Sequence, residues 1–159
     1  MRRLTPFLVL AVLCASREAH ALDGERRAQL GAGAAYGGEA SALLFGGWAY
    51  GIKDSVDLRA DLLGTLSPAS SGATLALHLG GLWKWEVTQW VPYVGVGLGG
   101  RRDFAARRWD LLLVPAAGLD YLLNRETSFV IEYRPTITLT HERTLEHQAL
   151  LGFEFRWGW

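Results

Sequence analysis

The chain has 159 residues with 16 basic and 16 acidic side chains, so its formal net charge at neutral pH is zero. This balance excludes the strong basic field that characterises nucleic-acid-binding proteins. The single cysteine, Cys14, lies near the N-terminus, which excludes disulfides, thiol catalysis and cysteine metal sites from the remainder of the chain.

The first segment, 1–21, has the three parts of a secretory signal peptide. Arg2 and Arg3 precede an apolar stretch over Leu4–Ala15, and Ala19–Ala21 forms a small-x-small cleavage site. The apolar stretch is too short to cross a bilayer as a helix, which favours a cleaved signal over an N-terminal membrane anchor. We therefore expect an exported protein with one domain over 22–159.

Strand-length segments separated by turn residues follow the signal. Their predicted ranges are 28–37, 41–50, 55–66, 73–85, 92–100, 110–123, 127–139 and 148–159. The connections at 51–54, 86–91 and 124–126 are tight, whereas those at 67–72, 101–109 and 140–147 are longer and more polar. Short periplasmic turns and longer outer loops alternate in this way in outer-membrane barrels. The pattern predicts an all-β, eight-stranded antiparallel up-and-down transmembrane β-barrel.

Side chains alternate in character along several of these segments. In 55–66, Asp57, Arg59 and Asp61 share one face, and the opposite face is apolar. A soluble sandwich or lipocalin-like barrel would bury the apolar face, but here few helices or loops remain to cover it. We therefore expect lipid to contact that face. Its expected members include Leu58, Ala60, Leu62, Leu75, Leu77, Leu79, Ile131 and Ile137.

Aromatic residues are predicted at two heights if the mature N-terminus is periplasmic. The periplasmic set is Trp48, Tyr50, Trp83, Trp85, Trp90, Tyr93, Tyr121, Phe129, Trp157 and Trp159. Tyr36, Phe104 and Trp109 fall at the other end. Two such belts are typical of proteins that span a membrane.

The polar face is expected to line the barrel interior. Its predicted charge network is Asp57, Arg59, Asp61, His78, Lys84, Asp120, Glu132, Arg134, Glu154 and Arg156. The charges nearly balance, so we interpret them as a salt-bridged filling in place of a hydrophobic core, with a conducting pore as the alternative. A barrel of this size has little space for an aqueous channel.

Three loose motifs suggest a family. They are the glycine-rich run Pro92–Gly100, the segment Ala117–Tyr121 and the triplet Glu132–Arg134. With these motifs the mature chain resembles small outer-membrane barrels of the OmpA, OmpX and OmpW-like type. The resemblance implies a location in the cell outer membrane, a monomer, and outer-membrane lipids, lipopolysaccharide and the barrel-assembly machinery as partners.

The closing segment Leu151–Trp159 is similar to the alternating aromatic C-terminal strand that the assembly machinery of these barrels recognises. Its aromatic members here are Phe153, Phe155, Trp157 and Trp159. Most members of the group end in phenylalanine, so the terminal tryptophan is a departure from the pattern.

Few residues suggest reactive chemistry, and we expect no cofactor. His141, Glu142, Glu146 and His147 cluster in one predicted outer loop, but a loop lacks the helical spacing of a metal site, so a solvated polar loop is the preferred interpretation. His78 is interpreted as a hydrogen-bonded filler rather than a catalytic base.

Four arginines, Arg101, Arg102, Arg107 and Arg108, are placed in the predicted loop 101–109. Such a charge run either keeps the loop solvated or contacts lipopolysaccharide phosphates.

Two prolines interrupt predicted strands, Pro115 in 110–123 and Pro135 in 127–139. Neither can donate a hydrogen bond to a sheet. A turn centred near Arg125 would place them opposite one another. Either they form a bulge that adjusts curvature, or they mark a lateral gap for a lipid tail, which resembles the side openings of the outer-membrane palmitoyltransferase.

The leading functional hypothesis is a non-enzymatic envelope barrel with a structural, surface-interaction or small-molecule passage role. The alternative is a lipid-modifying enzyme of the acylase or palmitoyltransferase kind, which would need His141 and a serine from 67–71 to meet near the outer rim. A soluble periplasmic carrier is a third class and would need the charged face outward.

Overall fold

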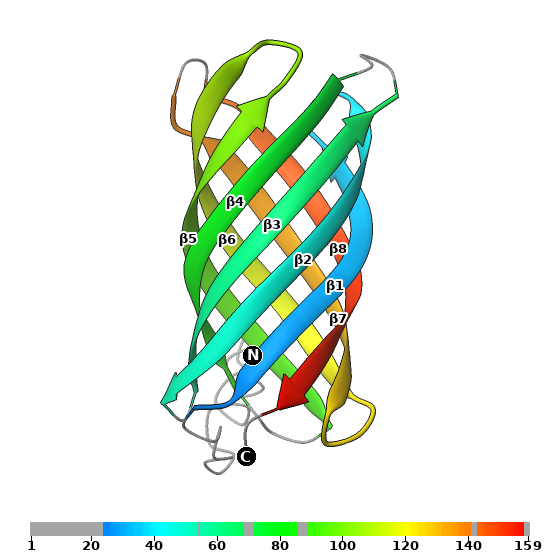
Figure 1. Ribbon diagram of the computed structural model, residues 1–159, viewed down its shortest axis with the longest axis vertical. Coiled ribbons are helices and arrows are strands. Elements are labelled where there is room, and N and C mark those ends of the chain that lie inside the picture. The colour runs from blue at the N-terminus through cyan, green and yellow to red at the C-terminus, as the bar shows by residue number, and fades with distance from the viewer. Residues whose placement is uncertain (1–23, 54, 69–71, 86–88, 141–142, 158–159) are drawn as a thin grey trace, which may run out of the picture.

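The computed structural model describes residues 24–53, 55–68, 72–85, 89–140 and 143–157. Its strands are β1 (Arg26–Tyr36), β2 (Ala40–Lys53), β3 (Val56–Ser67), β4 (Gly72–Lys84), β5 (Trp90–Asp103), β6 (Arg108–Leu122), β7 (Thr127–Thr138) and β8 (Leu145–Trp157). Each strand pairs antiparallel with the next, and β1 pairs with β8, which closes the barrel (Figure 1). The predicted fold class is therefore confirmed. The expected signal peptide and Trp159 lie outside the described residues.

No helix in the described part of the chain has the length and apolar character needed to cross a membrane.

Most strand bounds agree with the predicted ranges to within a few residues. The main difference is at the β5–β6 hairpin, because β5 continues to Asp103 and β6 already begins at Arg108. The connection is a tight turn in which Asp103 Oδ1 accepts a hydrogen bond from the Ala106 amide at 2.9 Å. Arg107 adopts a left-handed conformation there, with φ of 52°. The predicted loop over 101–109 was thus too long.

The outer surface of the barrel is apolar. Leu77 and Leu79 on β4 are 52% and 58% exposed, whereas His78 between them is 4% exposed. Of the expected lipid-facing residues, Leu58, Leu62, Leu75 and Ile131 are likewise exposed, and Ala60 and Ile137 are partly exposed. Apolar side chains outside and charged ones inside are the arrangement of a transmembrane barrel, not of a soluble one.

Aromatic side chains gather outside the barrel at the end where β1 begins and β8 ends. Trp48 stacks on Tyr50, and Trp90 lies 4.5 Å from Tyr121 between ring centroids. Tyr93 is an exception and corrects the predicted belt, because it is only 2% exposed and lies inside the barrel. On β5, Trp90 and Val94 face outward, so Tyr93 falls on the inner face.

The interior is layered rather than uniformly polar. Along β3 the inward residues Asp57, Arg59 and Asp61 are followed by Leu63, which belongs to an apolar cluster. That cluster consists of Ala35, Leu43, Phe45, Leu63, Ala76, Leu112, Val114 and Leu150. Beyond it, further charged side chains fill the end near the β5–β6 turn. The apolar layer corrects the expectation that salt bridges replace a hydrophobic core throughout.

Candidate functional site

The first polar layer is centred on Lys84, at the end of β4. Its ammonium nitrogen lies 2.9 Å from Asp120 on β6, 3.5 Å from Asp57 on β3 and 3.6 Å from Glu154 on β8. Arg156 Nη2 lies 3.1 Å from Glu154 and 3.8 Å from Asp120. This Lys84 network therefore joins strands from all around the barrel.

Three residues of this layer are not among the predicted interior charges. Glu25 and Arg27 precede the predicted first strand, which starts at Ala28, and Gln29 lies within it but is uncharged. Arg27 is fully buried and forms an ion pair with Asp57. Its Nη2 atom also lies 2.7 Å from Glu25 Oε2. Gln29 donates a hydrogen bond to Glu154 at 2.7 Å. The spacing of two residues between Glu25, Arg27 and Gln29 was the available signal for an inward face.

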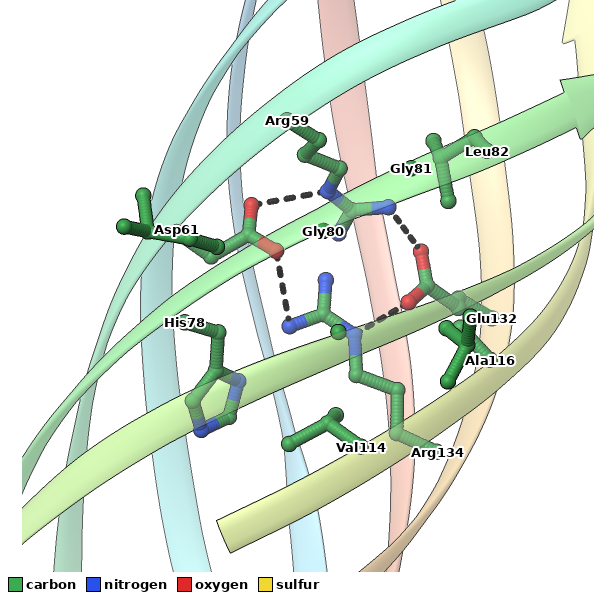
Figure 2. Close-up of a pocket in the computed structure, with 13 residues that line it drawn as sticks. Arg59, Asp61, His78, Gly80, Gly81, Leu82, Val114, Ala116, Glu132 and Arg134 are labelled. Carbon is green, nitrogen blue, oxygen red and sulfur yellow. Dashed lines mark hydrogen bonds and ion pairs between the residues drawn. The ribbon is translucent and has the colours of Figure 1, made fainter. Parts of the chain in front are cut away.

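The second polar layer is a closed ring of two arginines and two carboxylates, Arg59, Asp61, Arg134 and Glu132 (Figure 2). Arg59 lies 2.8 Å from Asp61 and 2.6 Å from Glu132. Arg134 lies 3.1 Å from Asp61 and also pairs with Glu132. Each charge of this four-residue ring thus has two opposite neighbours, which offsets the desolvation of buried ions.

Tyr93 completes the ring from the β5 side. Its hydroxyl donates to Glu132 Oε2 at 2.5 Å. The phenol lies over Gly118, its partner on β6, where a Cβ atom would overlap the ring of Tyr93. Glycine at this position therefore makes space for the tyrosine.

His78 is placed inside the barrel, as the alternation predicted, but without the expected hydrogen bond. Within the described residues neither ring nitrogen has a hydrogen-bond partner. The imidazole lines a cavity of about 30 Å³ beside the four-residue ring (Figure 2). A polar cavity of this size holds about two water molecules. The other nine predicted interior residues are buried and ion-paired.

The third polar layer contains Arg101, which the sequence analysis placed in an outer loop. Its guanidinium lies 2.9 Å from Glu146 and 3.7 Å from Asp110 inside the barrel. Asp110 also lies 3.5 Å from Arg108. Arg101 is therefore corrected from a lipopolysaccharide contact to an interior ion pair, because extension of β5 turns it toward carboxylates.

The remaining arginines of the hairpin are more accessible. Arg107 is exposed in the turn, and Arg108 keeps 47% of its side chain exposed. Arg102 lies over the Trp109 ring and donates to the Arg107 carbonyl at 3.0 Å.

We expect Arg101→Ala to lower the free energy of unfolding by about 1.5–3 kcal/mol, because it removes charged hydrogen bonds and leaves Glu146 and Asp110 with fewer partners. Arg107→Ala is the matched control and should change it by less than about 0.5 kcal/mol. Denaturant unfolding of the two variants from lipid vesicles measures both values. Equal costs would contradict the interior placement of Arg101.

The polar residues considered for metal binding or catalysis do not form one site in the described part of the chain. No group of three His, Cys, Asp or Glu side chains among the described residues is arranged to hold a metal ion. Glu146 is paired with Arg101, and His147 stacks on Tyr133 outside the barrel. Ser67 donates to Glu39 at 3.3 Å. His141, Glu142, Ser70 and Ser71 lie outside the described residues.

Pro115 and Pro135 face each other across the β6–β7 pair. Pairing between these strands is regular at Leu113↔Ile137 and at Ala117↔Tyr133, but it is interrupted between them. We call positions 114–116 and 134–136 the β6–β7 seam. Val114, Arg134 and Thr136 fill its inner side, so the interruption is a loss of backbone pairing rather than an open passage.

No protein-family model and no curated protein matches the chain. Similar solved structures include Neisserial surface protein A (TM-score 0.70, 12% identity, covering 86% of this chain and 98% of that one). A structure from the de novo design of transmembrane β-barrels has a TM-score of 0.64 at 15% identity, covering 87% and 100%. The outer membrane enzyme PagL has a TM-score of 0.60 at 11% identity, covering 81% and 98%.

The resemblance to small outer-membrane barrels is thus confirmed at the level of the fold. Eight strands close into one sheet, apolar side chains cover its outside, and the full length of each of these solved barrels is matched almost completely. The chain has the fold of a small transmembrane β-barrel.

Proposed function

We propose that the protein is a non-enzymatic outer-membrane barrel with a structural or surface-interaction role, and that solutes do not pass along its interior. The observation that carries this proposal is the layered filling. Two ion-paired layers, the Lys84 network and the four-residue ring, are followed by the apolar cluster around Leu43, Phe45 and Leu112. An ion entering this interior would have to cross a mostly apolar layer, whose cluster contains no charged side chain.

Reconstitution in a planar bilayer tests the sealed interior. We expect the inserted barrel to give no stepwise ionic current, because the interior side chains leave no continuous aqueous path. A porin with a water-filled channel, reconstituted in the same lipid, is the positive control. Reproducible conductance steps from the purified barrel would reject the structural role in favour of passage.

The location in the outer membrane is part of the same proposal. It is supported by the apolar exterior, by the aromatic side chains at the two ends and by the similarity in fold to the outer membrane enzyme PagL. Cell fractionation should recover the protein with outer membranes, and the folded barrel should migrate differently on a gel before and after boiling. Recovery in the soluble periplasm would refute the location.

The surface-interaction part of the role is suggested by exposed Arg107 and Arg108 and by half-buried Arg102 beside them. We infer that they contact anionic groups of lipopolysaccharide at the end of the barrel carrying the β5–β6 turn. Binding of lipopolysaccharide to the barrel should weaken when Arg107 and Arg108 are both changed to alanine. If the double variant binds lipopolysaccharide as well as the original barrel, the arginines do not contact lipopolysaccharide and only keep the turn solvated.

A further inference from the structure

The β6–β7 seam lacks two hydrogen bonds that a regular ladder would make. Leu139 N donates to Leu111 O, and Leu123 N donates to Thr127 O, so odd-numbered residues of β6 and β7 bond across this pair. The regular pairing on both sides places residue 115 opposite residue 135. These two positions would exchange both backbone hydrogen bonds. Because both residues are proline, neither bond can form.

The loss leaves two acceptors in the wall of the barrel. The carbonyl oxygens of Pro115 and Pro135 do not receive the N–H that a regular ladder would supply, because the residue opposite each one is proline. In a bilayer no bulk water is present to satisfy such groups, and transmembrane barrels otherwise pair all of them between strands. A hydrogen-bond donor from outside the ladder is therefore required at the seam.

Two polar side chains lie on the lipid-facing side beside these acceptors. His147 is the β8 partner of Pro135, and its Nδ1 lies 2.5 Å from the hydroxyl of Tyr133. The two rings stack with centroids 6.0 Å apart, and Tyr133 is 45% exposed. His147 also pairs with Tyr36 of the predicted outer aromatic belt, so the two rings lie at the level where the acyl chains of a lipid begin.

An apolar groove continues from the same place toward the end of the barrel where β1 begins. It has a volume of about 620 Å³ and reaches Ala117 and Tyr133, the first regular pair below the seam. Its lining includes the small outward-facing residues Ala34, Ala117 and Ala149 together with the larger Ile131 and Leu151. A linear hydrocarbon chain fits such a groove, and the polar end of the molecule would then lie at the seam.

We propose that the β6–β7 seam, with Tyr133, His147 and the adjoining groove, binds a lipid that carries hydroxyl or amide N–H donors at the base of its acyl chains. The donors satisfy the two proline carbonyls and the free edge of the imidazole, and one chain fills the groove. This inference rests on the proposed membrane location. It requires no opening of the barrel, since the inner side of the seam stays filled.

Infrared spectroscopy of the proline carbonyls tests the proposal directly. The barrel is produced with ¹³C-labelled proline carbonyls and reconstituted in vesicles of phosphatidylcholine, which has no donor, with increasing amounts of ceramide, which has an amide N–H and hydroxyls. The double variant Pro115→Val, Pro135→Val retains the other labelled prolines and restores both backbone donors. Subtracting its spectrum therefore leaves the carbonyl bands of Pro115 and Pro135.

We expect ceramide to move the carbonyl band of the two seam prolines to lower wavenumber in a saturable way, and ceramide methylated at its donors to leave it unchanged. His147→Phe should weaken the response about three- to tenfold, the effect of one lost hydrogen bond. A band already at low wavenumber in phosphatidylcholine alone would show that water occupies the seam and would overturn the proposal. So would a band that no ceramide concentration moves.

Failure of the barrel to insert into the bilayer is distinguishable in the same samples. A barrel that does not insert shows no difference in gel migration before and after boiling. An inserted barrel without a ceramide response rejects the lipid site alone.

Discussion

Replacing Glu132 by alanine is expected to lower the free energy of unfolding by about 3–5 kcal/mol, the usual cost of removing one partner from a buried ion pair. Glu132 is 3% exposed and accepts hydrogen bonds from Arg59, Arg134 and Tyr93. Without it, two arginines share Asp61 as their only remaining carboxylate partner within the ring. Reversible unfolding by denaturant from lipid vesicles measures the change.

Two variants show whether the unpaired charge is the cause. Glu126→Ala removes an exposed glutamate from the β6–β7 turn and should change the stability by less than about 0.5 kcal/mol. The double variant Glu132→Leu, Arg134→Met removes one charge of each sign and should cost less than Glu132→Ala alone. A cost below about 1 kcal/mol for Glu132→Ala would show that water, not the ring, stabilises this layer.

Placing arginine at Leu77 is expected to cost about 2–4 kcal/mol, because a charged side chain near the membrane midplane of a barrel loses its hydration. Leu77 lies in the middle of β4, is 52% exposed and pairs with Leu62 and Gly100. None of these neighbours offers a carboxylate to the new cation. The free energy of unfolding from bilayers measures the effect.

The control places the same side chain outside the membrane. Ala106→Arg lies in the exposed β5–β6 turn and should cost almost nothing. If the two substitutions lower the free energy of unfolding in bilayers equally, the outer face of β4 does not contact lipid. The assignment of the inner and outer faces of the barrel would then be wrong.

Alternation was enough to predict the fold because most strands carry polar and apolar residues on opposite faces. Asp57, Arg59 and Asp61 show this on β3, and the structure buries all three. The apolar layer could not be found in this way. Where it crosses a strand, both faces are apolar, as at Leu111–Val114 on β6, so the period of two disappears.

Charged residues near strand ends were the other source of error. Arg101 and Arg102 were assigned to a loop because charge usually indicates solvent, yet Arg101 meets Glu146 and Asp110 inside the barrel. Which arginine meets which carboxylate depends on the tilt and stagger of strands around the closed barrel. Arg59 and Glu132 lie on β3 and β7, and no local pattern in the sequence relates them.

The wide spread of partners around Lys84 also determines how the barrel must assemble. Asp57 lies on β3, next to the strand of Lys84, but the other two carboxylates lie on β6 and β8. The network is complete only when β1 and β8 pair, which brings Arg27 beside Arg156. An open sheet would present these charges to the hydrocarbon, where ions are unstable. Partly inserted chains are therefore high in energy, and insertion should proceed together with closure as one cooperative transition.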